Sequence, residues 1–162
     1  MKKIIFLDID GVVCTARSHF ASGKKGIMLD WDATGCDLIS QICEKTGAKI
    51  VISSTWRHEA HQQDLFSRLI KHGLWGHMFC DVNASGAWAT PWKPSASRGN
   101  EIDMWIEQNG PIDEYVIIDD NHQFHGQQIE RFIQTEPTNG ISAEDFQKAL
   151  GLFGIKTGVI LL

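Results

Sequence analysis

The chain has 162 residues, of which 43% are hydrophobic and 22% are charged, and its formal net charge is -5. This composition excludes a disordered or fibrous protein, and the length suits one compact domain with its own core. No stretch reaches the ~20 apolar residues that span a bilayer, and the acidic balance excludes an overall basic surface for binding along a nucleic-acid backbone. Any polyanionic ligand must therefore meet local positive charge.

The first half of the chain alternates between strand and helix patterns. Residues 4–7 form a short unbroken apolar run that predicts a strand, and the glycine- and lysine-containing residues 15–31 predict a loop. Residues 37–46 carry one apolar stripe and predict a helix that stops at Gly47. Residues 50–52 form a second apolar run and predict a second strand.

The second half continues the alternation. Residues 60–71 and 100–108 place apolar side chains at helical spacing, whereas residues 83–97 are irregular. Residues 115–118 predict a third strand. Residues 142–150 predict a terminal helix with Ser142 as its cap, while the tail at 155–162 is open between a strand and an unpacked end.

The three apolar runs are rich in Ile and Val, which is typical of strands buried on both faces. The order of elements therefore predicts an α/β fold, a three-layer Rossmann-like domain with a central parallel sheet. We expect residues 1–162 to form a single domain.

Polar residues follow each apolar run. Asp8 and Asp10 follow the first run, the Ser-Ser-Thr-Trp-Arg segment 53–57 follows the second, and Asp119 and Asp120 end the third. One such group alone is typical of a turn or a helix cap. The carboxyl ends of neighbouring parallel strands, however, open onto one crevice, where four carboxylates would repel unless a cation lay among them. Mg²⁺ suits such oxygen ligands.

These motifs resemble those of the haloacid dehalogenase (HAD) superfamily of phosphatases. The segment IIFLDIDGVV resembles its first motif, KIVISS its second and YVIIDD its fourth, so the resemblance runs from Lys3 to about Asn121. It implies a HAD-like hydrolase that works through an aspartyl-phosphate intermediate with Mg²⁺ as its cofactor.

The resemblance also implies roles for the residues of the first and fourth motifs. Asp8 is expected to attack phosphorus, and Asp10 to protonate the leaving oxygen and then deprotonate water. Gly11 permits a sharp turn that brings backbone groups to the phosphate. The metal ligands are expected to be the Asp8 carboxylate, the Asp10 backbone carbonyl, and Asp119 or Asp120.

The remaining site residues are expected from the second and third motifs. Ser53 is the preferred phosphate-binding hydroxyl and Ser54 the second choice. Arg98, just before a predicted helix, is favoured over Lys93 as the basic residue of the third motif. Arg57 is open between a phosphate-binding fork and a salt bridge to a carboxylate.

Too few residues separate the motifs for a full cap domain, which predicts an open site that admits the end of a polymer. The segment SSTWR and the pattern R-G-x-E-I-x-x-W are similar to phosphatase modules of nucleic-acid end repair, including those of polynucleotide kinase-phosphatases. Trp88 and Trp92 are open between stacking on bases and packing a long loop. The cations expected beside the crevice are Lys93, Arg17, Lys24 and Lys25.

The favoured function is hydrolysis of a terminal phosphate on a nucleic acid or of a nucleotide. Two alternatives stay open: a phosphatase for a sugar phosphate or phosphoprotein, and a non-catalytic phosphate-binding module. The spacing of the four cysteines matches neither a zinc site nor a disulfide scaffold, which indicates reduced thiols and a cytoplasmic protein. No membrane partner is expected, and the oligomeric state is left open.

Overall fold

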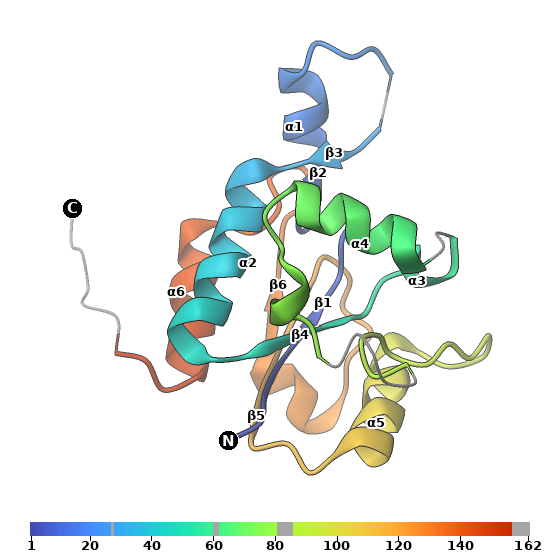
Figure 1. Cartoon of the computed structure of the whole chain (residues 1–162), viewed down its shortest axis with the longest axis vertical. Coiled ribbons are helices and arrows are strands. Elements are labelled where there is room, and N and C mark those ends of the chain that lie inside the picture. The colour runs from blue at the N-terminus through green and yellow to red at the C-terminus, as the bar shows by residue number, and fades with distance from the viewer. Residues whose placement is uncertain (27, 60–61, 81–85, 157–162) are drawn as a thin grey trace.

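A parallel four-stranded sheet forms the centre of the molecule. The computed structural model describes residues 1–26, 28–59, 62–80 and 86–156. The strand order is β4-β1-β5-β6, and every neighbouring pair is parallel (Figure 1). The bounds are Lys3–Leu7 for β1, Lys49–Ile52 for β4, Glu114–Asp119 for β5 and Phe132–Gln134 for β6. The predicted α/β class with a central parallel sheet is confirmed.

Helices cover both faces of this sheet, because alternate residues of its strands point to opposite sides. Ile5 and Leu7 of β1 pack into a core with α2 (Ala33–Thr46), α4 (Gln62–Lys71) and α6 (Ala143–Leu152). Ile4 and Phe6 pack on the other face, against Ile102 and Trp105 of α5 (Arg98–Asn109). Full burial on both faces explains why the strands read as continuous apolar runs.

Side-chain caps define the ends of the principal helices. Asp32 caps α2, whose predicted stop at Gly47 is present with φ of 72°, and Ser97 caps α5. Ser142 caps α6 as predicted and forms a capping box with Asp145. Shorter helical elements of the body are α3 (Trp56–Glu59) and the 3₁₀ turns η1 (Gly76–Met78) and η2 (Gly126–Arg131).

The segment between β1 and α2 is more ordered than the predicted loop. It contains β2 (Cys14–Thr15), α1 (Ala16–Ala21) and β3 (Asp30–Trp31), and β2 pairs antiparallel with β3. We call this segment, residues 14–31 without residue 27, the arm; it projects from the body at the top of Figure 1. A six-residue helix and two-residue strands are too short to produce a clear hydrophobic period, which explains why the sequence indicated a loop.

Two other predictions differ from the structure at their edges. The helix expected at 60–71 is described from Gln62, and α3 precedes it; residues 60 and 61 lie outside the described part of the chain. In the tail, residues 155 and 156 belong to no helix or strand, and residues 157–162 lie outside the described part of the chain. Among the described helices, none has the length and apolar character needed to cross a membrane.

Candidate active site

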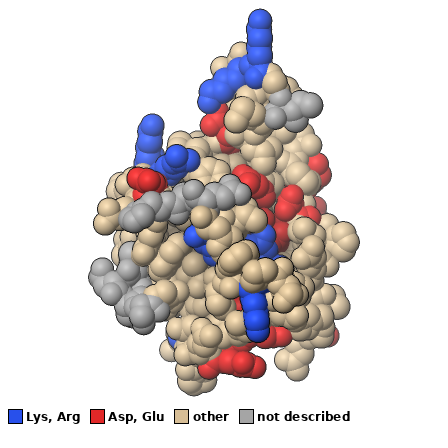
Figure 2. All heavy atoms as spheres, turned by 90° about the vertical axis from the view of Figure 1, so that its right-hand side faces the viewer, with Lys and Arg blue, Asp and Glu red and all other residues tan. Residues whose placement is uncertain are grey.

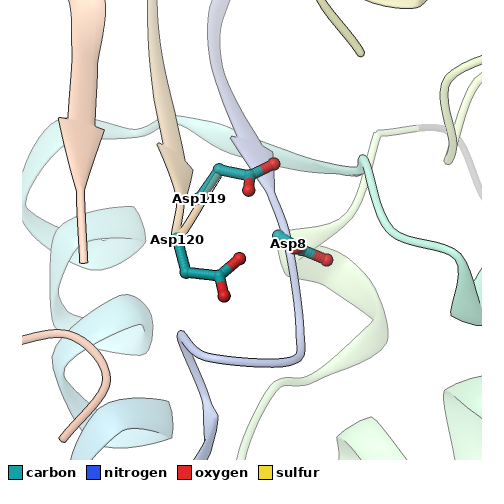
Figure 3. Close-up of side chains that lie close together, drawn as sticks. All are labelled: Asp8, Asp119 and Asp120. Atoms are coloured by element: carbon teal, nitrogen blue, oxygen red, sulfur yellow. The ribbon is translucent and has the colours of Figure 1, made fainter. Parts of the chain in front are cut away.

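Three carboxylates from two neighbouring strands lie together at one edge of the sheet. Asp8 directly follows β1, Asp119 ends β5 and Asp120 comes next, so the parallel pairing of β1 with β5 brings them to the same level. One ligand oxygen from each lies within 4.8 Å of the others (Figure 3). Asp8 and Asp119 are buried, at 6% and 1% exposure. These three of the four predicted carboxylates therefore lie together at the strand ends.

Burial makes this cluster electrostatically costly. Burial, followed by repulsion from the Asp8 carboxylate, raises the pKa of Asp119 to about 8. Burial also raises the pKa of Asp8, against the opposing effects of Arg98 and of a hydrogen bond with the Ser54 side chain. Backbone amides satisfy one oxygen of each: Ile9 N donates to Asp8 Oδ1 at 2.8 Å and Asn121 N to Asp119 Oδ1 at 2.8 Å.

The cluster fits a hard divalent cation. Asp119 Oδ2 is buried and accepts no hydrogen bond from any described residue. Its nearest cationic partner is Arg98, whose Nε lies 3.6 Å away. A buried carboxylate oxygen that accepts no hydrogen bond, beside two further carboxylates, belongs to the oxygen donor set that Mg²⁺ prefers, and the ion would remove the repulsion among them.

Asp10 lies apart from this cluster and is held by an aromatic residue. Trp56 Nε1 donates to Asp10 Oδ2 at 3.0 Å, while Asp10 is not among the three carboxylates that converge. The Trp56 ring is fixed by an edge contact with Trp31 at 5.5 Å and by the Arg68 guanidinium at 5.5 Å. No role was predicted for Trp56. Its position in SSTWR, just after the second strand, was the feature of the sequence that could have indicated a place in the site.

Gly11 allows Asp120 to approach the turn after β1. Its φ of 73° lies in the left-handed region, and a Cβ built on it would lie 2.6 Å from Asp120 Oδ2. Thr135 Oγ1 donates to the Gly11 carbonyl at 2.8 Å and pins the turn from the far side. Gly11 therefore has a steric role beside the predicted backbone one, and Thr135 is a supporting residue that no motif indicated.

The hydroxyl and basic residues of the second and third motifs also lie near the carboxylates. The Ser54 side chain lies close enough to Asp8 to lower the pKa of that carboxyl, whereas Ser53 Oγ is buried with no partner among the described residues. The preference for Ser53 over Ser54 stays a prediction. Arg98, at the first turn of α5, faces Asp119, while the Lys93 side chain is exposed. The choice of Arg98 is supported by this placement and stays a prediction.

Arg57 forms the salt bridge that was one of its two interpretations. Its Nη2 lies 2.6 Å from Glu101 Oε2, and the two side chains are only 4% and 6% exposed. Nη1 donates to the Ser54 carbonyl. The pair therefore joins α3 to α5 behind the second motif, and a direct phosphate contact by Arg57 stays a prediction.

Two of the three predicted cations of the arm form ion pairs. Arg17 contacts Asp32 at 2.6 Å and Lys24 contacts Asp30, whereas Lys25 is exposed. Figure 2 shows Lys and Arg side chains projecting from the arm at the top, and acidic side chains beside basic ones near the middle of this face. Positive charge is therefore local rather than spread over the surface.

Comparison with known proteins identifies a family. A family model described as "HAD domain in Swiss Army Knife RNA repair proteins" matches residues 4–146. The match includes all four strands of the central sheet and every carboxylate of the cluster. A search of curated proteins found no match.

Proposed function

The chain belongs to the HAD domains of Swiss Army Knife RNA repair proteins, and from this premise we propose that it removes a terminal phosphate from RNA by Mg²⁺-dependent hydrolysis through an aspartyl-phosphate on Asp8. The HAD superfamily suggested by the sequence motifs is confirmed. The coarse activity, phosphohydrolase chemistry, follows from the family. The metal, the intermediate and the RNA end are our proposal.

The convergence of three carboxylates supports the proposal most strongly. Ligand oxygens of Asp8, Asp119 and Asp120 lie within 4.8 Å of one another at the ends of adjacent strands. Arg98 forms an ion pair with Asp119, and the Asp10 carboxylate accepts a hydrogen bond from Trp56. A structural role does not require two buried carboxylates and a half-buried one to face one another, because each adds an electrostatic penalty. The arrangement suits a site that gathers a cation and a phosphate.

The first step would be attack by Asp8 on phosphorus. The hydrogen bond from Ile9 N fixes Asp8 Oδ1, which leaves Oδ2 as the attacking atom. As the new Asp8–phosphorus bond forms, the bond from phosphorus to the leaving oxygen breaks, and Asp10 donates its proton to that oxygen. Arg98 and the Ser54 hydroxyl lie beside Asp8, where they would bind oxygens of the phosphoryl group.

The second step would hydrolyse the aspartyl-phosphate. Asp10, now ionised, takes a proton from water as the water oxygen attacks phosphorus, and the bond to Asp8 breaks to release phosphate. The hydrogen bond from Trp56 would hold the Asp10 carboxyl in place through both steps. Mg²⁺ held by Asp8 with Asp119 or Asp120, and by the Asp10 carbonyl, would supply neutralisation of the charge on the transferring group.

The RNA end is proposed from the family description and from the open surroundings of the site. The segment between β1 and α2 contains only the short elements of the arm, which favours a substrate that extends out of the crevice. The paired state of most arm cations agrees with recognition of an end rather than of a long backbone.

The test is a comparison of substrates. Purified protein with Mg²⁺ should hydrolyse oligoribonucleotides carrying a 3'- or 5'-phosphate faster than free nucleotides, sugar phosphates or phosphopeptides. The Asp8→Asn variant serves as the blank, and Glu130→Gln, an exposed carboxylate on η2, as the matched control with full activity. Faster turnover of a sugar phosphate or phosphopeptide would replace RNA as the substrate. Binding of phosphate without any turnover would support a non-catalytic module.

The cytoplasmic location also remains a proposal. Cys14, Cys36 and Cys43 are buried thiols. Burial raises the pKa of Cys36 and of Cys43 to about 12, so both stay protonated and unreactive. Such thiols are typical of proteins in a reducing compartment.

A further inference from the structure

A second hollow borders the candidate active site on the side of α5. It has a volume of about 520 Å³, which is in the range of small-ligand sites. None of the clustered carboxylates lines it, so it is distinct from the proposed metal site. Its lining comes from α3, from the segment 86–92 and from the second half of α5: Arg57, His58, Gly86, Trp88, Ala89, Thr90, Pro91, Trp92, Trp105, Gln108 and Asn109.

The aromatic lining of this pocket is partly available to a ligand. Trp92 is 61% exposed, and its ring lies 5.0 Å from that of His58 with an interplanar angle of 53°. Trp88 has a different role, because it packs edge-on against Phe66 at 5.3 Å as part of the core. Of the two tryptophans considered in the sequence, Trp88 therefore packs the loop, whereas Trp92 offers a ring face.

The polar lining contains unsatisfied groups. Arg57 Nε and Thr90 Oγ1 are buried, and neither has a hydrogen-bond partner within the described parts of the chain. Buried polar atoms are rarely left unpaired, and those that are often mark a place for a water or a ligand group. Gln108 adds an amide, which can both donate to and accept from the edge of a base.

The pocket is connected to the nucleophile through two residues. Arg57 borders the pocket and donates to the Ser54 carbonyl, and the Ser54 side chain lies close enough to Asp8 to lower the pKa of that carboxyl. The charge of Asp8 also acts on Arg57 directly, since it raises the pKa that burial lowers. Arg57 therefore lines the pocket and is also close enough to Asp8 to respond to its charge, which places the pocket beside the proposed phosphate position.

We infer that this pocket binds the nucleoside next to the terminal phosphate, with its base stacked on Trp92. The inference rests on the proposed function for the position of the phosphate. Single-stranded RNA ends present unstacked bases, and proteins bind these on aromatic side chains and through hydrogen bonds to base edges. The pocket combines both kinds of contact beside Arg57, and it would give preference to a nucleotide over a phosphate on a small alcohol or sugar.

The test measures binding without turnover. In the full-length Asp8→Asn protein with Mg²⁺, isothermal titration calorimetry compares ribodinucleotides carrying a 3'- or a 5'-phosphate with inorganic phosphate. Trp92→Ala should weaken dinucleotide binding about 5- to 150-fold, the effect of losing one base-aromatic stack. Its affinity for inorganic phosphate should not change. Trp92→Phe should retain most of the dinucleotide affinity because a ring face remains.

The matched control is Trp75→Ala, which removes a tryptophan that is 52% exposed and lies outside the pocket lining. It should bind both probes as the parent protein does. Equal dinucleotide affinity in Trp92→Ala and the parent would overturn the inference, as would an equal loss of inorganic phosphate binding. A failure of the proposed function is distinguishable, since it would appear as absent turnover by the unmodified protein whatever the binding results.

Discussion

Trp56 shows how a single contact can separate the two roles of neighbouring aspartates. Asp8 lies with Asp119 and Asp120, whereas the Asp10 carboxylate accepts a hydrogen bond from the Trp56 indole at 3.0 Å. A general acid must stay off the metal to carry a proton. The indole N–H provides that restraint from a ring that is itself fixed by Trp31.

Trp56→Phe should therefore lower turnover of an alkyl phosphate about tenfold or more, which is the effect of losing a hydrogen bond to a charged group. Turnover of an aryl phosphate should fall less, because an aryl oxide leaves without a proton. Steady-state kinetics on the two substrates checks this difference. Trp31→Phe is the control, since it keeps the indole donor of Trp56. An equal loss on both substrates would mean that Trp56 only supports the fold.

The steric role of Gly11 can be separated from its backbone role by comparison with Gly23. Gly11 and Gly23 both have φ of 73°, but only at Gly11 would a Cβ meet another residue, namely Asp120 Oδ2 at 2.6 Å. Gly11→Ala should displace Asp120 and weaken Mg²⁺ binding measured by calorimetry. Gly23→Ala should cost only the backbone penalty, about 1–2 kcal/mol of unfolding free energy, and leave Mg²⁺ binding intact. Equal Mg²⁺ affinity in the two variants would contradict the steric argument.

The sequence predicted which residues come together in the site. It did not predict the individual contacts that each of them makes. The convergence of Asp8, Asp119 and Asp120 was predicted because each follows or ends an apolar strand. In a parallel sheet, the carboxyl ends of neighbouring strands lie at the same edge. Ser53 was preferred over Ser54 because it comes first after the strand; both serines are buried, and the choice between them stays a prediction. Which of two adjacent hydroxyls points to the crevice depends on backbone torsions after the strand, which residue types do not specify.

At the scale of elements, the Arg57–Glu101 pair links α3 to α5 across the second and third motifs. Both side chains are nearly inaccessible to water, and Glu101 also accepts from Lys93 N at 3.3 Å. A buried ion pair is costly to break because the remaining charge loses its partner without regaining water. This pair therefore positions Arg98, which lies three residues before Glu101 on α5.

Glu101→Gln should reduce the free energy of unfolding by about 3–5 kcal/mol, measured by urea denaturation, since it leaves the Arg57 charge buried and unpaired. The double variant Arg57→Met with Glu101→Leu should recover most of this loss, because no charge remains in the interior. Glu107→Gln, on an exposed position of the same helix, is the control and should be neutral. A neutral Glu101→Gln would show that the pair is open to solvent.

The sequence predicted those helices and strands that are long enough to show a clear pattern of apolar residues. Strands β1, β4 and β5 were found from unbroken apolar runs, and the Ser142 cap of α6 from its own chemistry. Strand β6 has three residues and was missed, because only Ile133 of it is buried. Such short elements are stabilised by their neighbours rather than by a local pattern.

At the scale of the whole molecule, the carboxylate cluster should couple Mg²⁺ binding to stability. Without the ion, the molecule keeps a buried oxygen of Asp119 with no hydrogen-bond partner among the described residues. Mg²⁺ at a hundredfold excess over its Kd should add about 2.7 kcal/mol, or a rise in Tm of about 5–10 °C for a chain of this size. Differential scanning fluorimetry with and without EDTA measures it.

Measured above pH 8, where the Asp119 carboxyl is ionised even without the metal, Asp119→Asn should raise the Tm of the metal-free protein, because it removes a buried charge that faces Asp8. It should also abolish most of the Mg²⁺ response. Asp113→Asn, an exposed carboxyl before β5, should keep the full response. An unchanged Mg²⁺ response in Asp119→Asn would place the ion elsewhere.

Trapping the intermediate tests whether Asp8 is phosphorylated during turnover. In Asp10→Asn, an aryl phosphate should still phosphorylate Asp8, but hydrolysis of the intermediate should be slow because water lacks its base. Acid quenching during turnover, followed by borohydride reduction and mass spectrometry, should then find homoserine in place of Asp8 and unmodified Asp119 and Asp120. Reduction at another aspartate, or at none while phosphate is still released, would contradict the account.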